Sequence, residues 1–371
     1  MRIGIDARLY KETGIGRYIR NLIRELSLLD NRNQYFVFLK KTEYDKFQIP
    51  NRNWTKAQIN IDWHSLKEQY FVPQILSKYK LDVMHFPYFN VPILYSGKYL
   101  LTIHDLIVDH FNTGRASTHQ PIIYKIKRLA YISAMKIGIK KASYISVISE
   151  TTKKEVMDHY QIANDKIIVT YDSLDDNFKK TALKAIAKNY YRFPYILYVG
   201  NAYPHKNLEN LIIAFLNLSK KKNIHLVLAG DDPFFYQRLK DFCRDKDKKK
   251  KIHFFGNAND EQLVSLYKNA ELLVFPSFME GFGLPNFESL FCQKLPVVSD
   301  IPVFRELFGN SLPYFDPTDV KSIEKTIIGV LNLIKLSYIQ KVEKAKSNLS
   351  KYSWRKTAEK TLSLYDLIYK S

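Results

Sequence analysis

One stretch, from Glu271 to Phe291, constrains the fold more than any other part of the chain. Residues 271–275 are apolar and strand-like, and residues 285–291 continue as a helix after a loop that contains two glycines. Pro285 suits the first turn of that helix, because this turn needs no N–H from it and its φ is already set. The pattern predicts a strand, a tight loop and a helix, which is the unit of a parallel α/β sheet.

The loop in this stretch carries the residues that an anion site needs. Gly281 and Gly283 let the backbone approach a ligand closely, because neither has a Cβ. Their amides and the positive end of the helix would suit a phosphate. Glu288 lies about one turn inside the helix, where its carboxylate can accept two hydrogen bonds from a ribose diol. Glu280 precedes the glycines, where a reacting sugar would lie. The alternative is an ordinary strand-to-helix turn with Glu288 in water.

Length and composition favour a two-domain globular protein. The chain has 371 residues, of which 46% are hydrophobic and 25% charged. No run of about 18 uncharged apolar residues is present, so no membrane-spanning helix is expected. The first residues lack the apolar core of a signal peptide. The two cysteines, Cys243 and Cys292, form no disulfide framework, which favours a reducing cytoplasm. No His/Cys cluster has metal-ligand spacing, so we expect no metal site.

The net charge of +20 indicates a polyanionic partner, which could be nucleic acid, an anionic membrane or a phosphorylated substrate. A nucleic-acid-binding protein would cluster basic and aromatic residues on one face. The sequence shows no such module, and this function would leave Glu280 and Glu288 unexplained. We therefore expect no nucleic-acid partner.

Residues 122–141 have the pattern of a basic amphipathic helix. Apolar residues recur every three or four positions, and no acidic residue occurs between Asp109 and Glu150. One interpretation is an interfacial helix that lies on anionic lipid. The other is a domain helix with its apolar face in the core and its lysines in water.

Strands alternate with helical patterns in both halves of the chain, so we predict an α/β protein with two doubly wound parallel sheets. The boundaries we expect are 1–175 for the first domain, 176–193 for a polar linker and 194–349 for the second domain. The strands are predicted within residues 2–7, 35–39, 82–87, 99–103, 142–148, 166–171, 195–199, 224–230, 252–256, 271–275 and 295–300.

Three strings of residues resemble the retaining GT-B glycosyltransferases of family 4. The first is Glu280 to Glu288, with its two carboxylates around Gly-Phe-Gly-Leu-Pro. The second runs from Gly200 to Leu208 and contains Pro204 and Lys206, and the third is Thr-Ile-His-Asp-Leu at 102–106. The resemblance covers nearly the whole chain. It implies a GT-B fold, in which two Rossmann-like domains face a central cleft and a C-terminal helix, 350–371, crosses back to the first domain.

The resemblance also assigns roles to individual residues. The catalytic group would be Glu280, Lys206 and His104. The nucleotide sugar would be bound by Gly16, Asn201, Lys206, Asn257, Gly281, Phe282, Gly283, Leu284, Pro285 and Glu288. Gly14 and Asp105 would lie on the acceptor side. Asp105 could orient the imidazole of His104 or contact an acceptor hydroxyl.

Some of these residues have another interpretation, and at some positions the chain departs from the family pattern. From position alone, His104 could be a histidine that caps a strand end and Lys206 an ordinary solvated lysine. The chain departs from the family pattern where His205 replaces an arginine and where Asn201 stands in the place of a second cation. It departs again at Gly14-Ile15-Gly16, where the family often has two adjacent glycines.

The function that the resemblance implies is transfer of a sugar from a nucleotide sugar, with retention, to a polyprenyl-linked oligosaccharide in O-antigen or surface polysaccharide synthesis. The sugar predicted is mannose, from GDP-mannose. A rhamnosyl-, glucosyl- or N-acetylhexosaminyltransferase of the same fold is an alternative, and a catalytically silent sugar-binding subunit is an alternative of another class. We expect no cofactor, and a cytoplasmic protein that binds peripherally to the inner face of the cell membrane.

Overall fold

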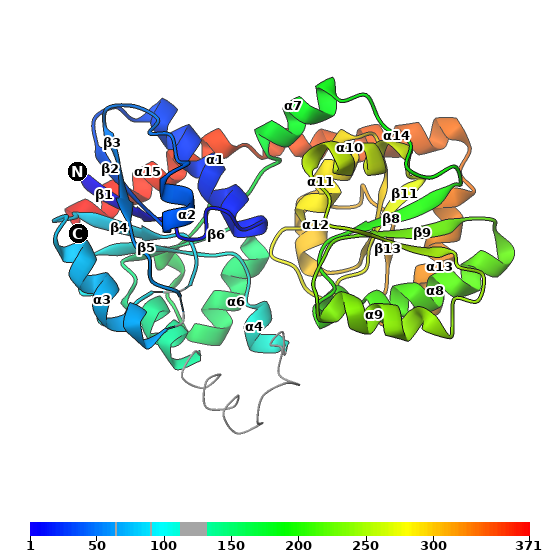
Figure 1. Ribbon diagram of the computed structural model, residues 1–371, viewed down its shortest axis with the longest axis horizontal. Coiled ribbons are helices and arrows are strands. Elements are labelled where there is room, and N and C mark those ends of the chain that lie inside the picture. Colours follow the sequence, from blue (N-terminus) through cyan, green and yellow to red (C-terminus); the bar gives the residue numbers. More distant parts are fainter. Residues whose placement is uncertain (64, 90, 112–131) are drawn as a thin grey trace. The chain divides into compact units, whose positions relative to one another are not determined.

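The computed structural model describes residues 1–63, 65–89, 91–111 and 132–371. The chain forms two compact units (Figure 1). Unit 1 takes its described residues from 1–109, 132–172 and 353–371, and unit 2 takes its own from 110–111 and 173–352. Each unit is an α/β layer structure around one parallel sheet.

Unit 1 is built on a seven-stranded sheet of order β3-β2-β1-β4-β5-β6-β7, with every pair parallel. Its strands are β1 (Arg2–Asp6), β2 (Gln34–Leu39), β3 (Trp54–Gln58), β4 (Val83–Phe86), β5 (Tyr99–Ile103), β6 (Tyr144–Val147) and β7 (Ile167–Val169). Its helices are α1 (Gly14–Leu29), α2 (Lys41–Tyr44), α3 (Leu66–Ser77), α4 (Ile107–His110), a helix over 132–141, α6 (Glu150–Tyr160), η1 (Asn164–Lys166) and α15 (Trp354–Lys370).

Unit 2 is built on a six-stranded sheet of order β10-β9-β8-β11-β12-β13, again parallel throughout. Its strands are β8 (Tyr195–Val199), β9 (His225–Ala229), β10 (Ile252–Gly256), β11 (Leu272–Phe275), β12 (Pro296–Ser299) and β13 (Tyr314–Phe315). Its helices are α7 (Asp176–Lys184), η2 (Pro204–Lys206), α8 (Leu208–Lys221), α9 (Phe235–Arg244), α10 (Asp260–Asn269), α11 (Leu284–Phe291), α12 (Pro302–Phe308), α13 (Val320–Leu331), α14 (Lys335–Lys346) and η3 (Ser347–Lys351).

Each predicted strand is present, and the fold class is confirmed. The strands are fully buried runs such as Val83–Phe86 and Leu272–Phe275, as expected where helices cover both faces of a parallel sheet. In unit 2, α8, α9 and α13 lie on one side of the sheet, and α10, α11 and α14 on the other (Figure 1). The stretch 176–193, predicted as a linker, contains the helix α7.

The C-terminal helix α15 belongs to unit 1, although almost half of the chain separates it from the rest of that unit. It packs on α1 and on β4, β5 and β6 (Figure 1). Trp354, Tyr365 and Ile368 are part of the same hydrophobic core as Ile3 and Tyr18. Besides the short excursion at His110, the chain passes between the units at Asp172–Ser173 and at Tyr352–Ser353. The Ser173 hydroxyl donates to the Tyr352 carbonyl over 3.1 Å.

Gly14 and Gly16 both lie in a helix. α1 begins at Gly14, so Gly14 and Gly16 form its first turn. A Cβ on Gly16 would lie 2.6 Å from the carbonyl oxygen of Tyr10 and 2.9 Å from that of Leu9. The glycine is therefore needed because the preceding turn packs directly against the helix backbone.

Candidate functional site

The loop between β11 and α11 has the geometry that the sequence predicts. Gly283 precedes the helix with φ +86°, and Pro285 lies in its first turn. A Cβ on Gly283 would lie 2.6 Å from a ring carbon of Phe304. Both the left-handed backbone and the close neighbour therefore require glycine at this position.

The same loop presents backbone amides at the start of a helix. Among the described residues, none accepts a backbone hydrogen bond from the amides of Gly281, Phe282 or Gly283. These amides lie at the N-terminal end of α11, where the helix dipole favours negative charge. Phe282 is buried and stacks on Phe287 at 4.9 Å between ring centroids, which fixes the loop on its helix. The loop is thus a firmly packed candidate anion site.

Lys206 and Glu280, two of the three predicted catalytic residues, form an ion pair. Lys206 ends the short helix η2 after β8, and Glu280 lies in the loop after the neighbouring strand β11. Lys206 Nζ lies 2.6 Å from Glu280 Oε1, and the Ser277 hydroxyl donates to the same oxygen over 2.6 Å. The side chains of the pair are only 12% and 8% exposed.

Hydrogen bonds from Asn207 and Phe278 hold the two loops that carry this pair. The Asn207 amide group donates to the Pro276 carbonyl over 3.0 Å and to the Pro317 carbonyl over 2.7 Å. The Phe278 amide donates to the His205 carbonyl over 2.8 Å. Burial, and then the positive charge of Lys206, lowers the pKa of His205 to about 3, so its imidazole is neutral at pH 7. His205 therefore supplies no positive charge in place of the family's arginine.

Glu288 is buried inside α11, with 2% of its surface exposed. The hydroxyl of Tyr267, on α10, donates to Glu288 Oε2 over 2.9 Å. This bond holds the carboxylate at a defined position on the helix that follows the glycine loop. Tyr267 stands 21 positions before Glu288 and has no signature in the sequence pattern.

Asn201 and Asn257 follow the ends of β8 and β10. The Asn201 carbonyl accepts a hydrogen bond from the Tyr198 hydroxyl over 2.6 Å, which shapes the turn into η2. Gly256 has φ +84° and accepts a hydrogen bond from the Gly230 amide over 2.9 Å, so the backbone turns sharply before Asn257, which is exposed. These loops lie at the carboxyl ends of the strands, where ligands bind in parallel sheets.

His104 and Asp105 follow β5 in unit 1. His104 Nε2 lies 2.9 Å from the Pro87 carbonyl and donates to it, and the ring meets Tyr18 edge-on at 4.9 Å. Burial lowers the pKa of His104 to about 4, so the imidazole is neutral at pH 7. One Asp105 oxygen accepts a hydrogen bond from the Ile107 amide over 3.0 Å. Pro87 orients the imidazole in this structure.

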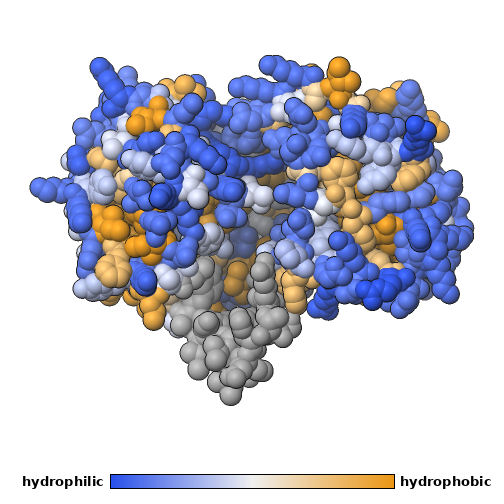
Figure 2. All heavy atoms as spheres, viewed as in Figure 1, coloured by the Kyte–Doolittle hydropathy of each residue, from blue (hydrophilic) through white to orange (hydrophobic). Residues whose placement is uncertain are grey.

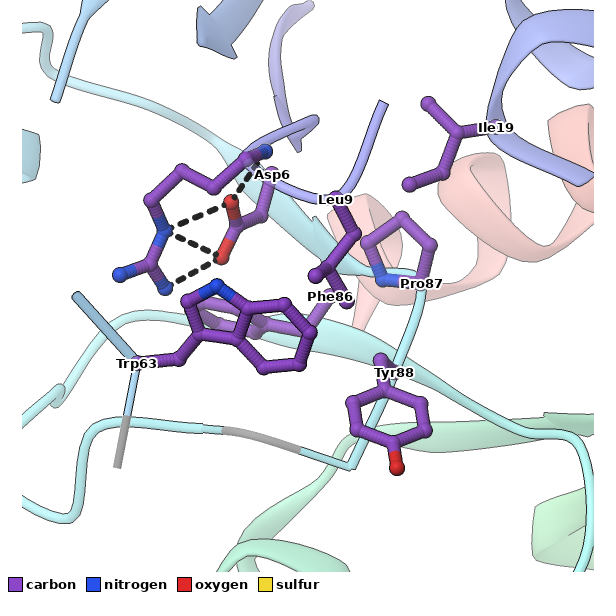
Figure 3. A pocket seen from close by; sticks show the side chains of 8 residues that line it. Asp6, Leu9, Ile19, Trp63, Phe86, Pro87 and Tyr88 are labelled. Carbon is purple, nitrogen blue, oxygen red and sulfur yellow. Dashed lines mark hydrogen bonds and ion pairs between the residues drawn. The ribbon is translucent and has the colours of Figure 1, made fainter. Parts of the chain in front are cut away.

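A pocket lies in unit 1 where β1 and β4 end. It is lined by Asp6, Arg8, Leu9, Ile19, Trp63, Phe86, Pro87 and Tyr88. Figure 3 shows the rings of Trp63 and Tyr88 along one side of the pocket and the carboxylate of Asp6 close by. Arg8 is buried and pairs with Asp6 at 2.6 Å and with Glu68 at 2.7 Å. The pocket thus combines aromatic rings with a buried arginine whose charge is paired with two carboxylates.

The predicted site residues are thus divided between the units. Unit 1 holds Gly14, Gly16, His104 and Asp105, and unit 2 holds the others. Within unit 2, Lys206 and Glu280 are in direct contact, and Glu288 lies on the helix that follows the glycine loop. Three supporting residues were missed from the sequence: Ser277, Asn207 and Tyr267. Asn207 follows Lys206 directly and Ser277 lies three residues before Glu280, so the motifs could have indicated them.

Two family models match the chain. Residues 13–178 match the model described as Glycosyltransferase Family 4, and residues 179–346 match Glycosyl transferases group 1. The two matches meet without a gap near the passage from unit 1 to unit 2.

The curated relatives include O-antigen mannosyltransferases. The chain is 30% identical over 208 residues to the O-antigen chain mannosyltransferase RfbU of Salmonella typhimurium, which covers 56% of each protein. It is 24% identical over 384 residues to O-antigen chain mannosyltransferase B of Escherichia coli, covering 97% of each. The chain thus spans about half the length of the first relative and nearly all of the second.

Solved glycosyltransferases have the same fold. A glycosyltransferase from Rickettsia africae matches with a TM-score of 0.71 at 19% identity, over 100% of this chain and 98% of that one. The glycosyltransferase WaaG, involved in lipopolysaccharide biosynthesis, matches with a TM-score of 0.72 at 12% identity, over 99% of each chain. With both family models matching in order and the GT-B fold shared, the chain belongs to the family 4 glycosyltransferases.

Proposed function

We propose that this glycosyltransferase transfers a mannosyl group from GDP-mannose, with retention, to a polyprenyl-linked saccharide during O-antigen synthesis. The observation that carries the proposal is the Lys206–Glu280 pair beside the glycine loop of α11, at 2.6 Å. The choice of mannose is supported by relatives named as O-antigen chain mannosyltransferases. A structural relative, HepE of Anabaena, was solved with UDP and glucose, so UDP-sugars are the first alternative donors.

The proposed reaction exchanges one bond at the anomeric carbon for another on the same face. The bond to the leaving phosphate oxygen breaks and its electron pair stays with the diphosphate. The acceptor oxygen bonds to the anomeric carbon, and its proton passes to the leaving phosphate. The chain must therefore stabilise negative charge on the diphosphate and partial positive charge on the sugar ring.

Lys206 and the loop amides are the groups that we assign to the diphosphate. The diphosphate would compete with Glu280 for the ammonium group, because a phosphate makes strong charge-assisted hydrogen bonds. Glu280, still held by the Ser277 hydroxyl, would then turn its free oxygen to the sugar hydroxyls. Donors that are already aimed at developing charge are each worth roughly 3–4 kcal/mol. Lys206 and the helix dipole supply this charge without a metal or cofactor in our proposal.

Glu288 is the residue that we assign to the ribose. Its carboxylate is held by the hydrogen bond from the Tyr267 hydroxyl, and it would accept hydrogen bonds from the ribose diol. The base would meet the backbone that follows Gly256, near Asn257.

The pocket at the ends of β1 and β4 is our candidate for the acceptor sugar. A sugar ring would place its apolar face on Trp63 or Tyr88. The Trp63→Ala variant should therefore raise the KM for the acceptor several-fold and leave the affinity for the nucleotide sugar unchanged. An unchanged acceptor KM would remove this pocket from the proposal.

The first experiment is thermal stabilisation of the protein by GDP-, UDP-, CDP-, ADP- and dTDP-sugars without added metal. A ligand at 100 times its Kd stabilises the folded state by about 2.7 kcal/mol. GDP-mannose should give the largest shift, and a lipid-linked acceptor should then yield a product with the same anomeric configuration as the donor. No shift with any sugar nucleotide would favour a catalytically silent subunit.

Lys206→Ala tests the mechanism with a matched control. Turnover should fall about 100-fold or more, because one pre-aimed donor is lost. The control is Lys220→Ala, which removes an exposed lysine from the end of the following helix and should leave turnover unchanged. Full activity of a folded Lys206→Ala variant would exclude the assigned role.

No helix among the described residues combines the length and the apolar character needed to cross a membrane. A polyprenyl-linked acceptor would nevertheless require contact with lipid. We therefore propose peripheral binding at the cytoplasmic face of the membrane.

A further inference from the structure

The helix α3 of unit 1 is apolar on two faces, which a helix that only covers a sheet does not need. One face is in the core, where Val72 and Leu76 are each 1% exposed. On the other side, Leu66 is 90% exposed, Tyr70 56% and Phe71 46%. An amphipathic surface helix normally carries polar residues there. The exposed side of α3 thus has the composition of a contact surface.

Two neighbouring segments extend this exposed apolar surface. The Ile93 amide donates to the Gln69 side chain on α3 over 2.7 Å, so the loop 91–94 lies against α3. Leu94 in this loop is 60% exposed. The helix 132–141 also contacts this loop, since Lys141 Nζ donates to the Ile93 carbonyl over 3.4 Å. Ile137 in this helix is 37% exposed.

Five exposed apolar residues lie on these three contacting segments, and we call them the α3 surface: Leu66, Tyr70, Phe71, Leu94 and Ile137. Single exposed apolar residues are ordinary, but a contiguous group on a monomer marks an interaction site. Figure 2 shows hydrophobic side chains gathered over the part of unit 1 where α3 lies in Figure 1.

Within the three segments that carry the α3 surface, the exposed charges have one sign. In α3, in the segment 91–98 and in the helix 132–141, the exposed charged residues are all lysines: Lys67, Lys98, Lys136, Lys140 and Lys141. The acid within these segments is Glu68, which is fully buried and paired with Arg8 at 2.7 Å. An apolar centre with a lysine rim complements an anionic lipid headgroup layer above acyl chains.

We infer that the α3 surface docks the enzyme on anionic lipid, with Leu66, Tyr70, Phe71 and Leu94 entering the headgroup region and the lysines pairing with phosphate groups. The inference rests on the proposed function, because an enzyme whose acceptor is linked to lipid needs a surface that binds lipid. It does not involve the residues of unit 2 that we assign to the nucleotide sugar.

The sequence pointed to a different part of this region. The predicted basic helix 122–141 is described only from residue 132, and residues 122–131 lie outside the described part. The exposed apolar residues that carry the inference are mostly on α3 and the loop 91–94, which the sequence analysis did not assign to lipid.

Vesicle co-sedimentation of the full chain, without nucleotide, tests the inference. The probes are phosphatidylcholine vesicles and vesicles of phosphatidylcholine with phosphatidylglycerol. The apolar variant is Leu66→Ser with Tyr70→Ser and Leu94→Ser, and its binding to the anionic vesicles should fall at least tenfold. The charge variant is Lys67→Gln with Lys136→Gln and Lys140→Gln. It should lose about fivefold per lysine at low salt, because each is worth about 1 kcal/mol at an anionic surface.

Matched controls come from unit 2, which also exposes apolar residues and lysines. Leu336→Ser with Ile339→Ser removes side chains that are 64% and 46% exposed on α14. The charge control combines Lys248→Gln, Lys249→Gln and Lys250→Gln. It removes the same charge as the charge variant, but from an exposed turn. Both controls should bind vesicles like the wild type.

Equal losses in the controls and in the α3 surface variants would overturn the inference, as would a wild type that does not bind anionic vesicles. A thermal shift with nucleotide sugar, measured on the same variants, confirms folding and separates the two proposals. If the wild type binds no nucleotide sugar but its vesicle binding depends on the α3 surface, the proposed function fails and the docking surface stands.

Discussion

Lys206 and Glu280 come from loops 74 residues apart in the sequence and meet at 2.6 Å, with the Ser277 hydroxyl on the same carboxylate oxygen. Both side chains are nearly buried, so the pair is screened little by water. One partner is the cation that we assign to the diphosphate and the other the carboxylate that we assign to the sugar. Each therefore holds the other in place before a substrate arrives.

Glu280→Gln should separate the charge of this carboxylate from its shape. The amide keeps the bond from Ser277 but loses the attraction for Lys206 and for positive charge on the sugar. We expect kcat to fall about 100-fold or more, with a smaller change in nucleotide-sugar affinity. Steady-state kinetics checks this, and a variant with the wild-type kcat would show that the negative charge of Glu280 is not used.

Tyr267→Phe should weaken nucleotide binding, although Tyr267 is not one of the residues that we assign to the nucleotide. The hydroxyl that fixes Glu288 is lost, and a hydrogen bond to a charged group contributes about 1.5–3 kcal/mol to stability. We expect a lower melting temperature and a several-fold higher Kd for the nucleotide.

Glu288→Ala should raise the same Kd further, because the ribose partner itself is lost. The control is Glu261→Ala, at an exposed carboxylate in the first turn of α10. Isothermal titration would contradict the ribose role if Glu288→Ala bound nucleotide like the control.

Asn286→Leu should stabilise the protein. The Asn286 side chain is completely buried, and among the described residues neither its amide nitrogen nor its oxygen has a hydrogen-bond partner. Leucine has nearly the same shape and removes two unsatisfied polar atoms, each of which costs about 1–3 kcal/mol. Chemical denaturation should show a higher free energy of unfolding, and a loss of stability would mean that the amide has a partner in solution.

Asp172→Asn should change the pH dependence of stability. Burial raises the pKa of Asp172 to about 8, and its Oδ1 has no partner among the described residues. Between the unfolded value near 3.8 and about 8, the unfolded chain loses this proton and the folded chain keeps it, so the folded state loses stability as pH rises. Each unit of pKa difference corresponds to about 1.4 kcal/mol.

The asparagine variant has no such proton. Its melting temperature relative to the wild type should therefore rise from pH 5 to pH 8. Buried histidines such as His85, whose pKa burial lowers to about 3, act in the opposite direction in both proteins and cancel in the comparison. A difference that is constant with pH would show that Asp172 is ionised when folded.

The sequence predicted the elements whose residue pattern fits one kind of structure. Buried parallel strands are nearly continuous apolar runs, so the central strands of both sheets could be predicted. β3 was missed because it is an edge strand, and its Thr55, Lys56 and Gln58 give no apolar run. β13 was missed because it has only two residues.

The residues of the candidate site can also be separated into those that the sequence predicted and those that it did not. Local motifs gave Lys206, Glu280 and the glycine loop, because each lies directly after an apolar strand. The partners of these residues depend on neighbours in the sheet that are distant in sequence, and spacing cannot reveal them. A Gly-x-Gly pattern fits a tight turn as well as a close helix contact, so the sequence alone could not show that Gly14 and Gly16 begin α1.

The position of α15 has a consequence for synthesis. The core of unit 1 requires Trp354 and Tyr365, and the Tyr365 hydroxyl lies 2.7 Å from Nδ1 of the buried His85, 280 residues earlier. A ribosome makes these residues only after the whole of unit 2. Unit 2 can thus fold during translation before unit 1 completes its core, because unit 1 needs α15, which follows unit 2 in the chain.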